Sequence, residues 1–452
     1  MIVLRKRLLL WLIKAYIKKW GRNIIVYFGV GLFVFFIINM ALSSSLTRLP
    51  FVEKETIGMV GAYTTDDLPK EILDKISKGL TKTEKDGAVL PSIAEKWKIA
   101  PNGKAYAFYL RKNVRFSDGS DLTSDDINYD FKDVSIIRPD KYTIVFNLRD
   151  NYSPFLTTVS RPIFKKSFVG VGDYKVKKIK LNGSFVESIE LYSQRRHKVL
   201  IYQLFYPTAA SLKTAFALGE VSKITNLPDL NFKGTTFNSY KSASTEKRIN
   251  YNKLVTLFFN TKDRLLSSKT LREGLWYTMP DNFSQGERNP SPLSRFSYAN
   301  QEGVNTYQQD LEHARLLIES SQTATGSSRI TLTIDTLPKY EETAKTIASI
   351  WKKLNIDTRV KVVNEVPTSF QIFLGEFNIS SDPDQYVLWH SSQVNNITHY
   401  DNKRIDKLLE DGRKELDIEK RKIIYADFQK YIFADPPASF LFFPYYYEVS
   451  TK

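Results

Sequence analysis

One uncharged apolar run near the start of the chain most limits what the chain can fold into. Residues 24–42 read IIVYFGVGLFVFFIINMAL, nineteen residues without a charge, in which Asn39 is the only strongly polar one. As a helix this run is about 28 Å long, close to the thickness of the hydrocarbon core of a bilayer. We therefore expect residues 23–43 to form a transmembrane anchor and the remaining chain to fold outside it.

The flank before this run predicts the orientation. It carries seven basic residues and no acid: Arg5, Lys6, Arg7, Lys14, Lys18, Lys19 and Arg22. Because cytoplasmic flanks of membrane helices are enriched in Lys and Arg, we expect residues 1–22 in the cytoplasm and the main domain outside the cell or in the periplasm. The run is longer than the about 7–15 apolar residues of a cleaved signal peptide, so a retained single-pass anchor is predicted.

Composition excludes several classes of site. Of 65 Lys and Arg, seven lie in the basic flank, and the other 58 exceed the 49 Asp and Glu by nine. This excess is scattered along the chain without a clustered stripe or recognition motif, so no nucleic-acid partner is expected. The chain has no cysteine, which excludes disulfides, thiolate metal sites and cysteine nucleophiles.

The rest of the chain reads as alternating strands and helices. Before residue 198 the patterns predict a helix over 68–80, a short helical turn over 91–97, strands over 104–116 and 141–148, and a hairpin over 172–192 that turns at Asn182-Gly183. Strands are then expected at 198–205, 253–261, 330–336 and 357–363, and helices at 208–221, 268–279, 309–321, 340–354, 403–416 and 418–434. This alternation indicates α/β lobes with largely parallel sheets.

The segment Val114–Phe131 contains five aspartates, at positions 118, 121, 125, 126 and 130. It lacks the spacing of an EF-hand calcium loop, because a glycine directly follows Asp118. A carboxylate pair for hydrolysis stays open, but nothing else in the chain completes such a site. The residues predict a strand, a tight turn at Asp118-Gly119, and a helix capped by Thr123 with acids in its first turn.

Residues 90–131, LPSIAEKWKIAPNGKAYAFYLRKNVRFSDGSDLTSDDINYDF, resemble a segment shared by extracellular solute-binding proteins of family 5, the oligopeptide, dipeptide and nickel class. Five further blocks are similar to the family in the same order: 210–222, 256–281, 310–319, 340–360 and 400–443. The resemblance implies a two-lobed, type II periplasmic-binding-protein-like α/β fold. The lobes would be residues 44–245 with 420–452, including an extra subdomain at about 81–166, and residues 246–419, with crossings near 240–252 and 420.

The same resemblance implies a function and a partner. The protein would be the substrate-binding component of an ABC transporter, holding a peptide or similar extended polar solute in the cleft between its lobes and delivering it to the permease. An alternative from a different class is a membrane-tethered sensor or assembly protein that uses the same fold without transport. No GxSxG elbow, HExxH helix or Walker loop is present, so neither an enzyme nor a cofactor is expected.

The family resemblance also suggests ligand contacts. In peptide-binding members an Asp three residues before an Asp-Pro-Asp motif clamps the amino group of the ligand; here Asp382-Pro383-Asp384 match that motif, but the clamp position is Ile379. The candidate ligand-binding residues are Tyr63, Asp382, Asp384, Tyr386, Trp389, His390 and Tyr400. A metal site at His390, His399 and Asp401 is the weaker interpretation, since two imidazoles nine residues apart meet only through a loop. We therefore predict no metal.

Overall fold

The computed structural model describes residues 3–46, 52–84, 87–193, 195, 197–300, 308–325 and 329–452. The backbone divides into two compact units. The first is Met1–Glu53 with Arg196–Lys198, and the second is Lys54–Arg195 with Val199–Lys452. Residues 47–51, near the start of the predicted first lobe, lie outside the described residues.

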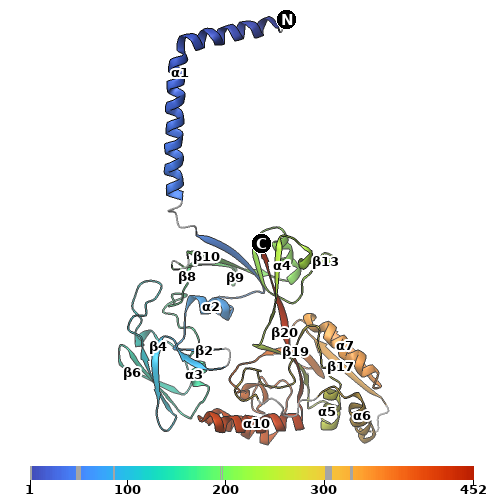
Figure 1. The fold of residues 1–452 in the computed structure, drawn as a ribbon. Coiled ribbons are helices and arrows are strands. Elements are labelled where there is room, and N and C mark those ends of the chain that lie inside the picture. The colour runs from blue at the N-terminus through green and yellow to red at the C-terminus, as the bar shows by residue number, and fades with distance from the viewer. Residues whose placement is uncertain are drawn as a thin grey trace. The chain divides into compact units, whose positions relative to one another are not determined.

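The first unit is dominated by α1 (Val3–Leu46), a long helix that bends near Asn23 (Figure 1). Its arms Ile13–Asn23 and Ile25–Met40 meet at 58°. Among the described residues no single helix has the length and apolar character of a membrane span, and this bent pair meets the criterion only when its two arms are taken together. The predicted single span over 23–43 is thus not confirmed.

The first lobe is built on five strands of a twelve-stranded sheet, in the order β11-β1-β10-β9-β8, with β1 and β11 parallel. Its core forms where apolar residues of β1, β9 and β10 pack on Ile72 and Ile76 of α2. The predicted hairpin is confirmed, and Gly183 supplies the positive φ (62°) that its turn requires. The bounds are β1 (Glu53–Val60), α2 (Lys70–Ile76), β8 (Lys175–Asn182), β9 (Phe185–Ser193), β10 (Lys198–Tyr206), α4 (Ala209–Ala217), β11 (Lys223–Leu227), β12 (Asn231–Phe232) and β13 (Thr235–Thr236).

A four-stranded antiparallel sheet, β4-β5-β7-β6, has a separate core whose residues run from Leu80 to Ile163. Tyr106, Phe108 and Leu110 face this core, as their alternation predicts. The helical turn predicted over 91–97 is wrong, because these residues lead into β4, which pairs with β5 and packs Trp97 beside Phe108. The bounds are β2 (Thr81–Thr83), β3 (Val89–Pro91), β4 (Ala94–Ile99), β5 (Ala105–Leu110), η1 (Ser124–Asp126), β6 (Val134–Asp140), β7 (Thr143–Leu148) and α3 (Phe155–Thr158).

The aspartate-rich segment of this subdomain folds as two successive turns. The N–H and hydroxyl of Ser120 donate to the Asp118 carboxylate at 2.9 and 2.6 Å. The N–H and hydroxyl of Thr123 donate to Asp126 at 2.8 and 2.9 Å. The predicted turn and cap are confirmed. The predicted helix is only the three-residue 3-10 turn η1, because Ile127 is already extended.

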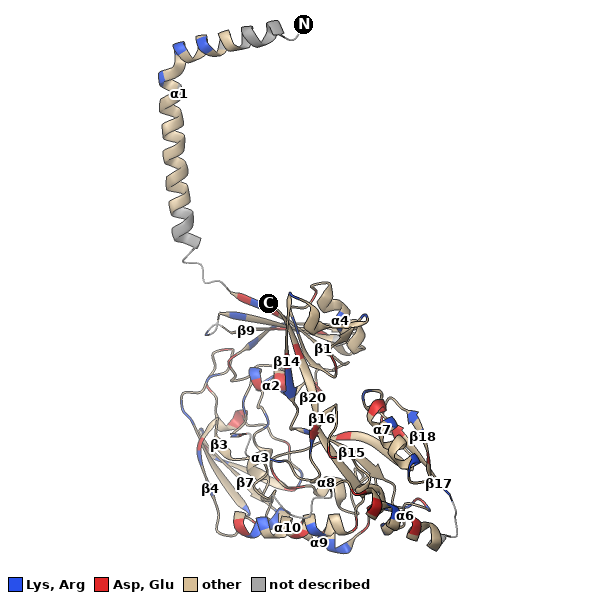
Figure 2. Ribbon diagram, turned by 45° about the vertical axis from the view of Figure 1, so that its right-hand side comes forward, with Lys and Arg blue, Asp and Glu red and all other residues tan. Residues whose placement is uncertain are grey.

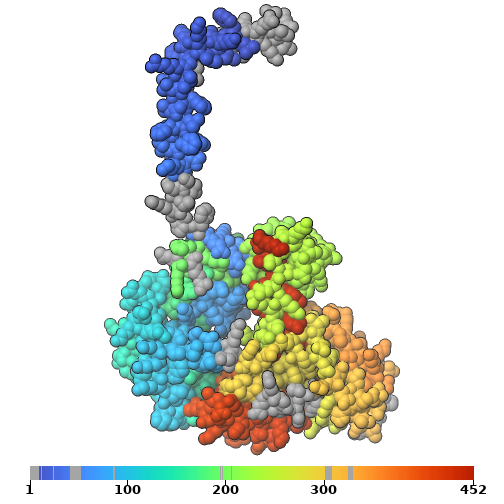
Figure 3. All heavy atoms as spheres, viewed as in Figure 1, coloured from blue at the N-terminus to red at the C-terminus, as the bar shows by residue number. Residues whose placement is uncertain are grey.

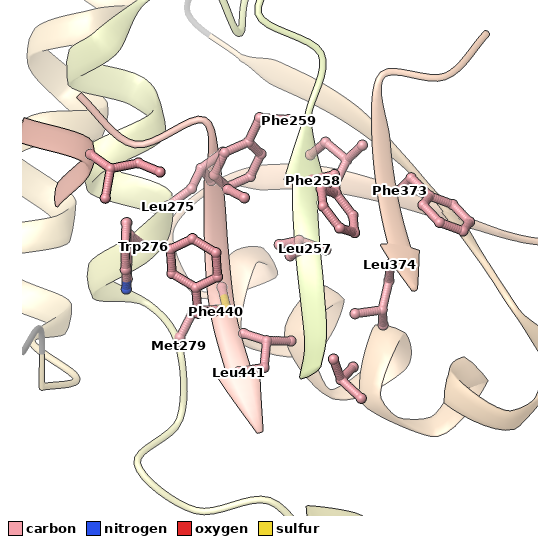
Figure 4. Packing of buried hydrophobic residues seen from close by; sticks show 14 of the residues in the cluster. Leu257, Phe258, Phe259, Leu275, Trp276, Met279, Phe373, Leu374, Phe440 and Leu441 are labelled. Carbon is pink, nitrogen blue, oxygen red and sulfur yellow. The ribbon is translucent and has the colours of Figure 1, made fainter. Parts of the chain in front are cut away.

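The second lobe continues the large sheet in the order β18-β17-β19-β15-β20, with β17 parallel to both neighbours. Figure 4 shows its core, where Trp276 of α5 packs edge-on against Phe440 of β20 (Ala438–Thr451). The bounds are β15 (Lys253–Phe259), α5 (Lys269–Tyr277), β16 (Gly286–Arg288), α6 (Leu311–Thr325), β17 (Ile330–Thr336), η3 (Pro338–Tyr340), α7 (Glu341–Lys352), β18 (Ile356–Val362), β19 (Ile372–Asn378), α8 (Tyr386–Trp389), α9 (Lys403–Lys414) and α10 (Ile418–Ala434).

Two long strands join the lobes: β14 (Ala243–Ile249), which follows η2 (Phe237–Ser239), and β20 (Ala438–Thr451). The first half of β20 pairs with β15 and β16, and its second half pairs with β14 and β11. Helix α10 contributes Tyr425 and Phe428 to the second-lobe core. We therefore propose that the return to the first lobe lies at Pro444, where the partners of β20 change, instead of near residue 420.

Candidate functional site

Most of the predicted site residues lie on one segment at the edge of the second lobe. The parallel strands β17, β18 and β19 end at this edge, and residues 379–392 follow β19 directly. In open α/β sheets ligands bind outside the carboxyl ends of the strands. The segment therefore occupies the position in which this class of fold builds a binding site.

Asp382 is bonded to a buried arginine. Both carboxylate oxygens of Asp382 accept from the Arg421 guanidinium at 2.8 Å, and Arg421 Nε donates to the Gly412 carbonyl at 2.7 Å. The side chain of Asp382 is 13% exposed and that of Arg421 is 3% exposed. Although burial lowers the pKa of Arg421, its hydrogen bonds and charge pairing with Asp382 raise that pKa overall. A bidentate pair of this kind fixes the segment on α10.

Asp384 is paired with a second arginine. Arg413 Nε donates to Asp384 Oδ2 at 2.8 Å, and the Arg413 guanidinium lies 4.2 Å from the Tyr386 ring centre and 5.3 Å from that of Tyr152. Tyr152 belongs to the subdomain, and the N–H of Ser153 donates to the Arg413 carbonyl at 2.7 Å. Figure 3 shows the cyan subdomain beside the orange-red C-terminal helices. Arg413 thus links the subdomain to the second lobe.

These pairs decide what the two aspartates can do. Ile379, at the position of the family's amine clamp, is buried in the second-lobe core and is only 7% exposed. Asp382 and Asp384, the possible substitutes, already neutralise Arg421 and Arg413. The segment therefore presents no unpaired carboxylate at positions 379, 382 or 384 for the amino group of a ligand.

Two predicted contacts are core residues instead. Trp389 is 1% exposed, donates to Gln385 Oε1 at 2.7 Å, and packs against Phe258 and Phe440. Tyr400 is buried, and its hydroxyl donates to Asp435 Oδ2 at 3.2 Å. Their apolar area is already covered by protein, so direct contact with a ligand is not supported for either.

Both ring nitrogens of His390 have polar partners within the protein. Its Nδ1 accepts from the N–H of Ser392 at 3.1 Å, and its Nε2 lies 3.3 Å from Glu410 Oε1. The His390 ring is tilted over the Tyr386 ring at 4.2 Å. His399 is exposed, whereas His390 is buried. Among the described residues no group of three or more His, Cys, Asp or Glu side chains could hold a metal ion.

Tyr63 lies in the first lobe, whereas the other six candidates fall between Asp382 and Tyr400 in the sequence. It follows β1, its hydroxyl donates to the Val60 carbonyl at 3.1 Å, and its carbonyl accepts from the N–H of Val186 at 2.7 Å. Burial, with Asp67 and then Glu71 nearby, raises the pKa of its hydroxyl. Tyr63 is half-buried, so part of its ring stays open to a ligand.

The sequence analysis missed a charged cluster at the same edge of the second lobe. Glu376 of β19 bonds Lys253 and the Tyr340 hydroxyl, and it lies 2.9 Å from Lys339 Nζ. Burial raises the pKa of Glu376, but Lys339 and Lys253 outweigh that effect and lower the pKa to about 2. No short-range pattern marks this cluster, because its members come from β15, β19 and the turn after β17.

Arg421 was also missed, although the sequence carries a signal for it. Arg421, Tyr425 and Gln429 recur every four residues along α10, and all three are buried. Residues at this spacing share one face of a helix. A buried helix face with an arginine, a tyrosine and a glutamine requires polar partners, and a search for nearby acids would have reached Asp382.

A pocket of about 470 Å³ lies in the subdomain beside Tyr152. It is lined by Phe131, Lys132, Asp133, Val134, Leu148, Arg149, Asp150, Tyr152, Phe155 and Thr158. None of the seven predicted contacts is among these residues. The pocket therefore does not coincide with the candidate site.

Comparison with known proteins identifies the family that the chain resembles. The model of bacterial extracellular solute-binding proteins, family 5 (middle), matches residues 88–135 and 128–398. The oligopeptide-binding protein AppA of Bacillus subtilis is 24% identical over 463 residues, covering 84% of this chain and 83% of AppA. The probable D,D-dipeptide-binding periplasmic protein DdpA of Escherichia coli is 22% identical over 427 residues, covering 81% and 80%.

Solved structures show the same fold. NikZ from Campylobacter jejuni in complex with Ni(L-His) has a TM-score of 0.73 at 20% identity, over 89% of this chain and 94% of NikZ. AppA from Bacillus subtilis in complex with a nonapeptide has a TM-score of 0.69 at 20% identity, over 88% and 94%. These neighbours confirm the predicted two-lobed α/β fold. With the family model matching well over half of its residues, the chain belongs to the bacterial extracellular solute-binding proteins of family 5.

Proposed function

We propose that this protein is the substrate-binding component of an ABC transporter that captures peptides or similar extended polar solutes and delivers them to a permease. The family assignment, the peptide-binding names of AppA and DdpA, and the position of residues 379–392 at the carboxyl edge of the sheet support this function. These relatives are binding proteins, which agrees with the absence of enzyme motifs in the sequence. They do not favour the alternative of a sensor or assembly protein.

We further propose that the ligand is bound without an acidic clamp on its amino group. This part of the proposal rests on the ion pairs of Asp382 with Arg421 and of Asp384 with Arg413. We propose that the ligand is instead held largely through its backbone, as an extended peptide is at a strand edge. We assign direct ligand contact to Tyr63 and Tyr386. Asp382, Asp384 and His390 then act as positioning residues, and Trp389 and Tyr400 support them from the core.

Matched peptides test the mode of recognition. Free and N-acetylated forms of the same peptides are titrated into the full chain by calorimetry, and their affinities are expected to agree within a few-fold. Loss of an ion pair in a closed cleft would cost about 2–5 kcal/mol, which is at least about thirtyfold. A hundredfold preference for the free amine would show that an acid clamps the ligand after all. Binding of metal chelates or sugars, with no binding of any peptide, would overturn the substrate class.

A matched pair of tyrosine variants tests the proposed contact. Tyr386→Leu is expected to weaken peptide binding about tenfold, because an aromatic surface for the ligand is lost. Tyr109→Leu, on β5 of the subdomain and half-buried like Tyr386, is expected to leave the affinity unchanged. Equal affinities for the two variants would remove Tyr386 from the site.

We also propose that α1 anchors the protein in the cell membrane, with its N-terminus in the cytoplasm and the binding domain outside. The apolar side chains of Ile25–Met40 are exposed on all sides of the helix, for example Tyr27, Phe28, Phe36 and Met40. A helix that is apolar all round requires an apolar surrounding. The full chain is expected to stay with membranes after alkaline carbonate washing. A mature chain that begins near Ser44 would show a cleaved signal peptide instead.

A further inference from the structure

The two arms of α1 differ in how they distribute charge. The arm Ile25–Met40 has no charged residue, whereas the arm before the bend carries Lys14, Lys18, Lys19 and Arg22 (Figure 2). A uniform apolar helix suits the interior of a bilayer. A helix with a basic face and an apolar face suits its surface.

The first arm has these two faces. At 100° per residue, five apolar side chains fall within an arc of about 120°: those of Leu10, Ile13, Tyr16, Ile17 and Trp20. The basic side chains fall within an arc of about 140° on the other side of the helix, which contains Lys14, Lys18, Lys19 and Arg22 together with Trp11. All of these side chains are exposed. The arm is therefore an amphipathic basic helix, and the listed side chains of its apolar face are exposed in the part of this unit that the structure describes.

The positive charge of this arm favours an anionic partner. No Asp or Glu occurs before Glu53, so nothing in this part of the sequence balances the basic face. Tryptophan and tyrosine, present here at Trp11, Tyr16 and Trp20, are enriched at membrane–water interfaces. The bend of 58° lets one arm cross a bilayer while the other departs from the direction of crossing.

We propose that the arm Ile13–Asn23, extended back to Leu10, lies in the plane of the membrane and binds anionic lipid headgroups of the cytoplasmic leaflet. Ile13, Ile17 and Trp20 would enter the acyl boundary, and the basic face would contact the headgroups. This inference rests on the proposed anchor. It adds a lipid preference that a spanning helix alone does not have.

The absence of cysteine makes a site-specific test direct. Single-cysteine variants Ile17→Cys on the apolar face, Lys18→Cys on the basic face and Phe36→Cys in the second arm carry a nitroxide label. The full chain is placed in vesicles of phosphatidylcholine with phosphatidylglycerol or of phosphatidylcholine alone. The label at 17 is expected to be accessible to oxygen and protected from a water-soluble nickel chelate, and the label at 18 the reverse. The label at 36 is expected to lie deep in both vesicles.

The accessibility of the three labels distinguishes the in-plane arm from the membrane anchor. Labels at 17 and 18 that are both open to water, with a deep label at 36, would overturn the in-plane arm and leave the anchor standing. Equally buried labels at 17 and 18 would show that the arm is inserted in the bilayer. A water-exposed label at 36 would overturn the anchor itself and this inference with it.

Charge variants complete the test. Replacing Lys14, Lys18, Lys19 and Arg22 by Gln in the Ile17→Cys chain is expected to weaken surface association of the arm about a hundredfold or more, because each basic residue near an anionic surface contributes to binding. The matched control replaces the three lysines by Arg and should retain association. Equal protection of residue 17 in the Gln and Arg variants, or in vesicles with and without phosphatidylglycerol, would show that lipid charge plays no part.

Discussion

Two acidic regions of the molecule use their carboxylates in opposite ways. In the subdomain, Asp118 and Asp126 bond the backbone and hydroxyl groups of residues two or three positions away. Along the carboxyl edge of the second lobe, Asp382 bonds Arg421, which lies 39 positions later in the chain. Asp125 of the first region is 83% exposed, and Asp382 of the second is 13% exposed. Burial and the distance to the partner therefore separate a local turn from a tertiary connection.

The comparison predicts a gradient of energetic importance. Exposed carboxylates that bond their own neighbourhood keep water as an alternative partner, so their removal costs little. A carboxylate that neutralises a buried guanidinium has no such replacement. The following substitutions test this gradient, and each is measured on the full chain by urea unfolding.

The largest effect is expected for Asp382→Ala. It leaves the guanidinium of Arg421 buried without its counterion, which costs about 3–5 kcal/mol in the free energy of unfolding. Asp382→Ala combined with Arg421→Met should cost less than the sum of the two single changes, because the second change removes the uncompensated charge. If Asp382→Ala lowers the free energy of unfolding by less than about 1 kcal/mol, Asp382 contributes no more to stability than the exposed acids of the subdomain.

Glu376→Gln is expected to rank second, at about 1.5–3 kcal/mol near neutral pH, since Glu376 makes charged hydrogen bonds but its lysine partners are partly exposed. The pKa of Glu376 is lowered to about 2, so its contribution is complete above the unfolded pKa of about 4.3 and is lost as the pH falls toward 2. The stability difference between the wild type and Glu376→Gln should therefore shrink over that window. If this difference in the free energy of unfolding stays constant down to pH 2, the pKa of Glu376 is not the source of the effect.

Asp126→Ala is expected to cost about 0.5–2 kcal/mol, because the N–H and hydroxyl of Thr123 lose their shared acceptor at the start of η1. Asp126→Asn keeps an acceptor oxygen and serves as the matched control, with a smaller loss. Equal losses for the Ala and Asn variants would mean that the charge of Asp126, and not its hydrogen bonds, stabilises the turn.

The smallest effect is expected for Asp125→Asn, within about 0.5 kcal/mol of the wild type. Asp125 Oδ1 lies 3.9 Å from Arg138 Nε, and that pair is open to solvent. A loss above about 1 kcal/mol at this exposed position would break the rule that burial decides the cost.

The same contrast explains which parts of the structure the sequence could predict. The turn at Asp118 and the cap at Thr123 depend on residues within three positions, so their pattern is visible in the chain. The alternation of Tyr106, Phe108 and Leu110 similarly marks β5. Residues 94–97 were misread as helical because β4 forms through pairing with β5, which local propensity does not encode.

The sequence predicts which segment holds the candidate site, but not the partners of its charged residues. The Asp-Pro-Asp motif located the segment, and the absence of the amine clamp at Ile379 was visible from the sequence. That Asp382 and Asp384 would be neutralised depends on Arg421 and Arg413, which reach them only after α9 and α10 have packed. The burial of Trp389 and Tyr400 likewise depends on surrounding elements and not on their neighbours in sequence.

The shared strand β20 sets the order of events when the chain is made and exported. A chain that crosses a membrane unfolded, from its N-terminus onward, delivers residues 438–451 after every other strand of both lobes. Until then β15 and β11 each expose a row of unpaired backbone donors and acceptors, which invites pairing with other chains. Arrival of this fourteen-residue strand joins the strands of both lobes into one sheet. On such a route neither lobe could complete its part of the sheet before residues 438–451 had crossed the membrane, and the unpaired strand edges would be open to pairing with other chains until then.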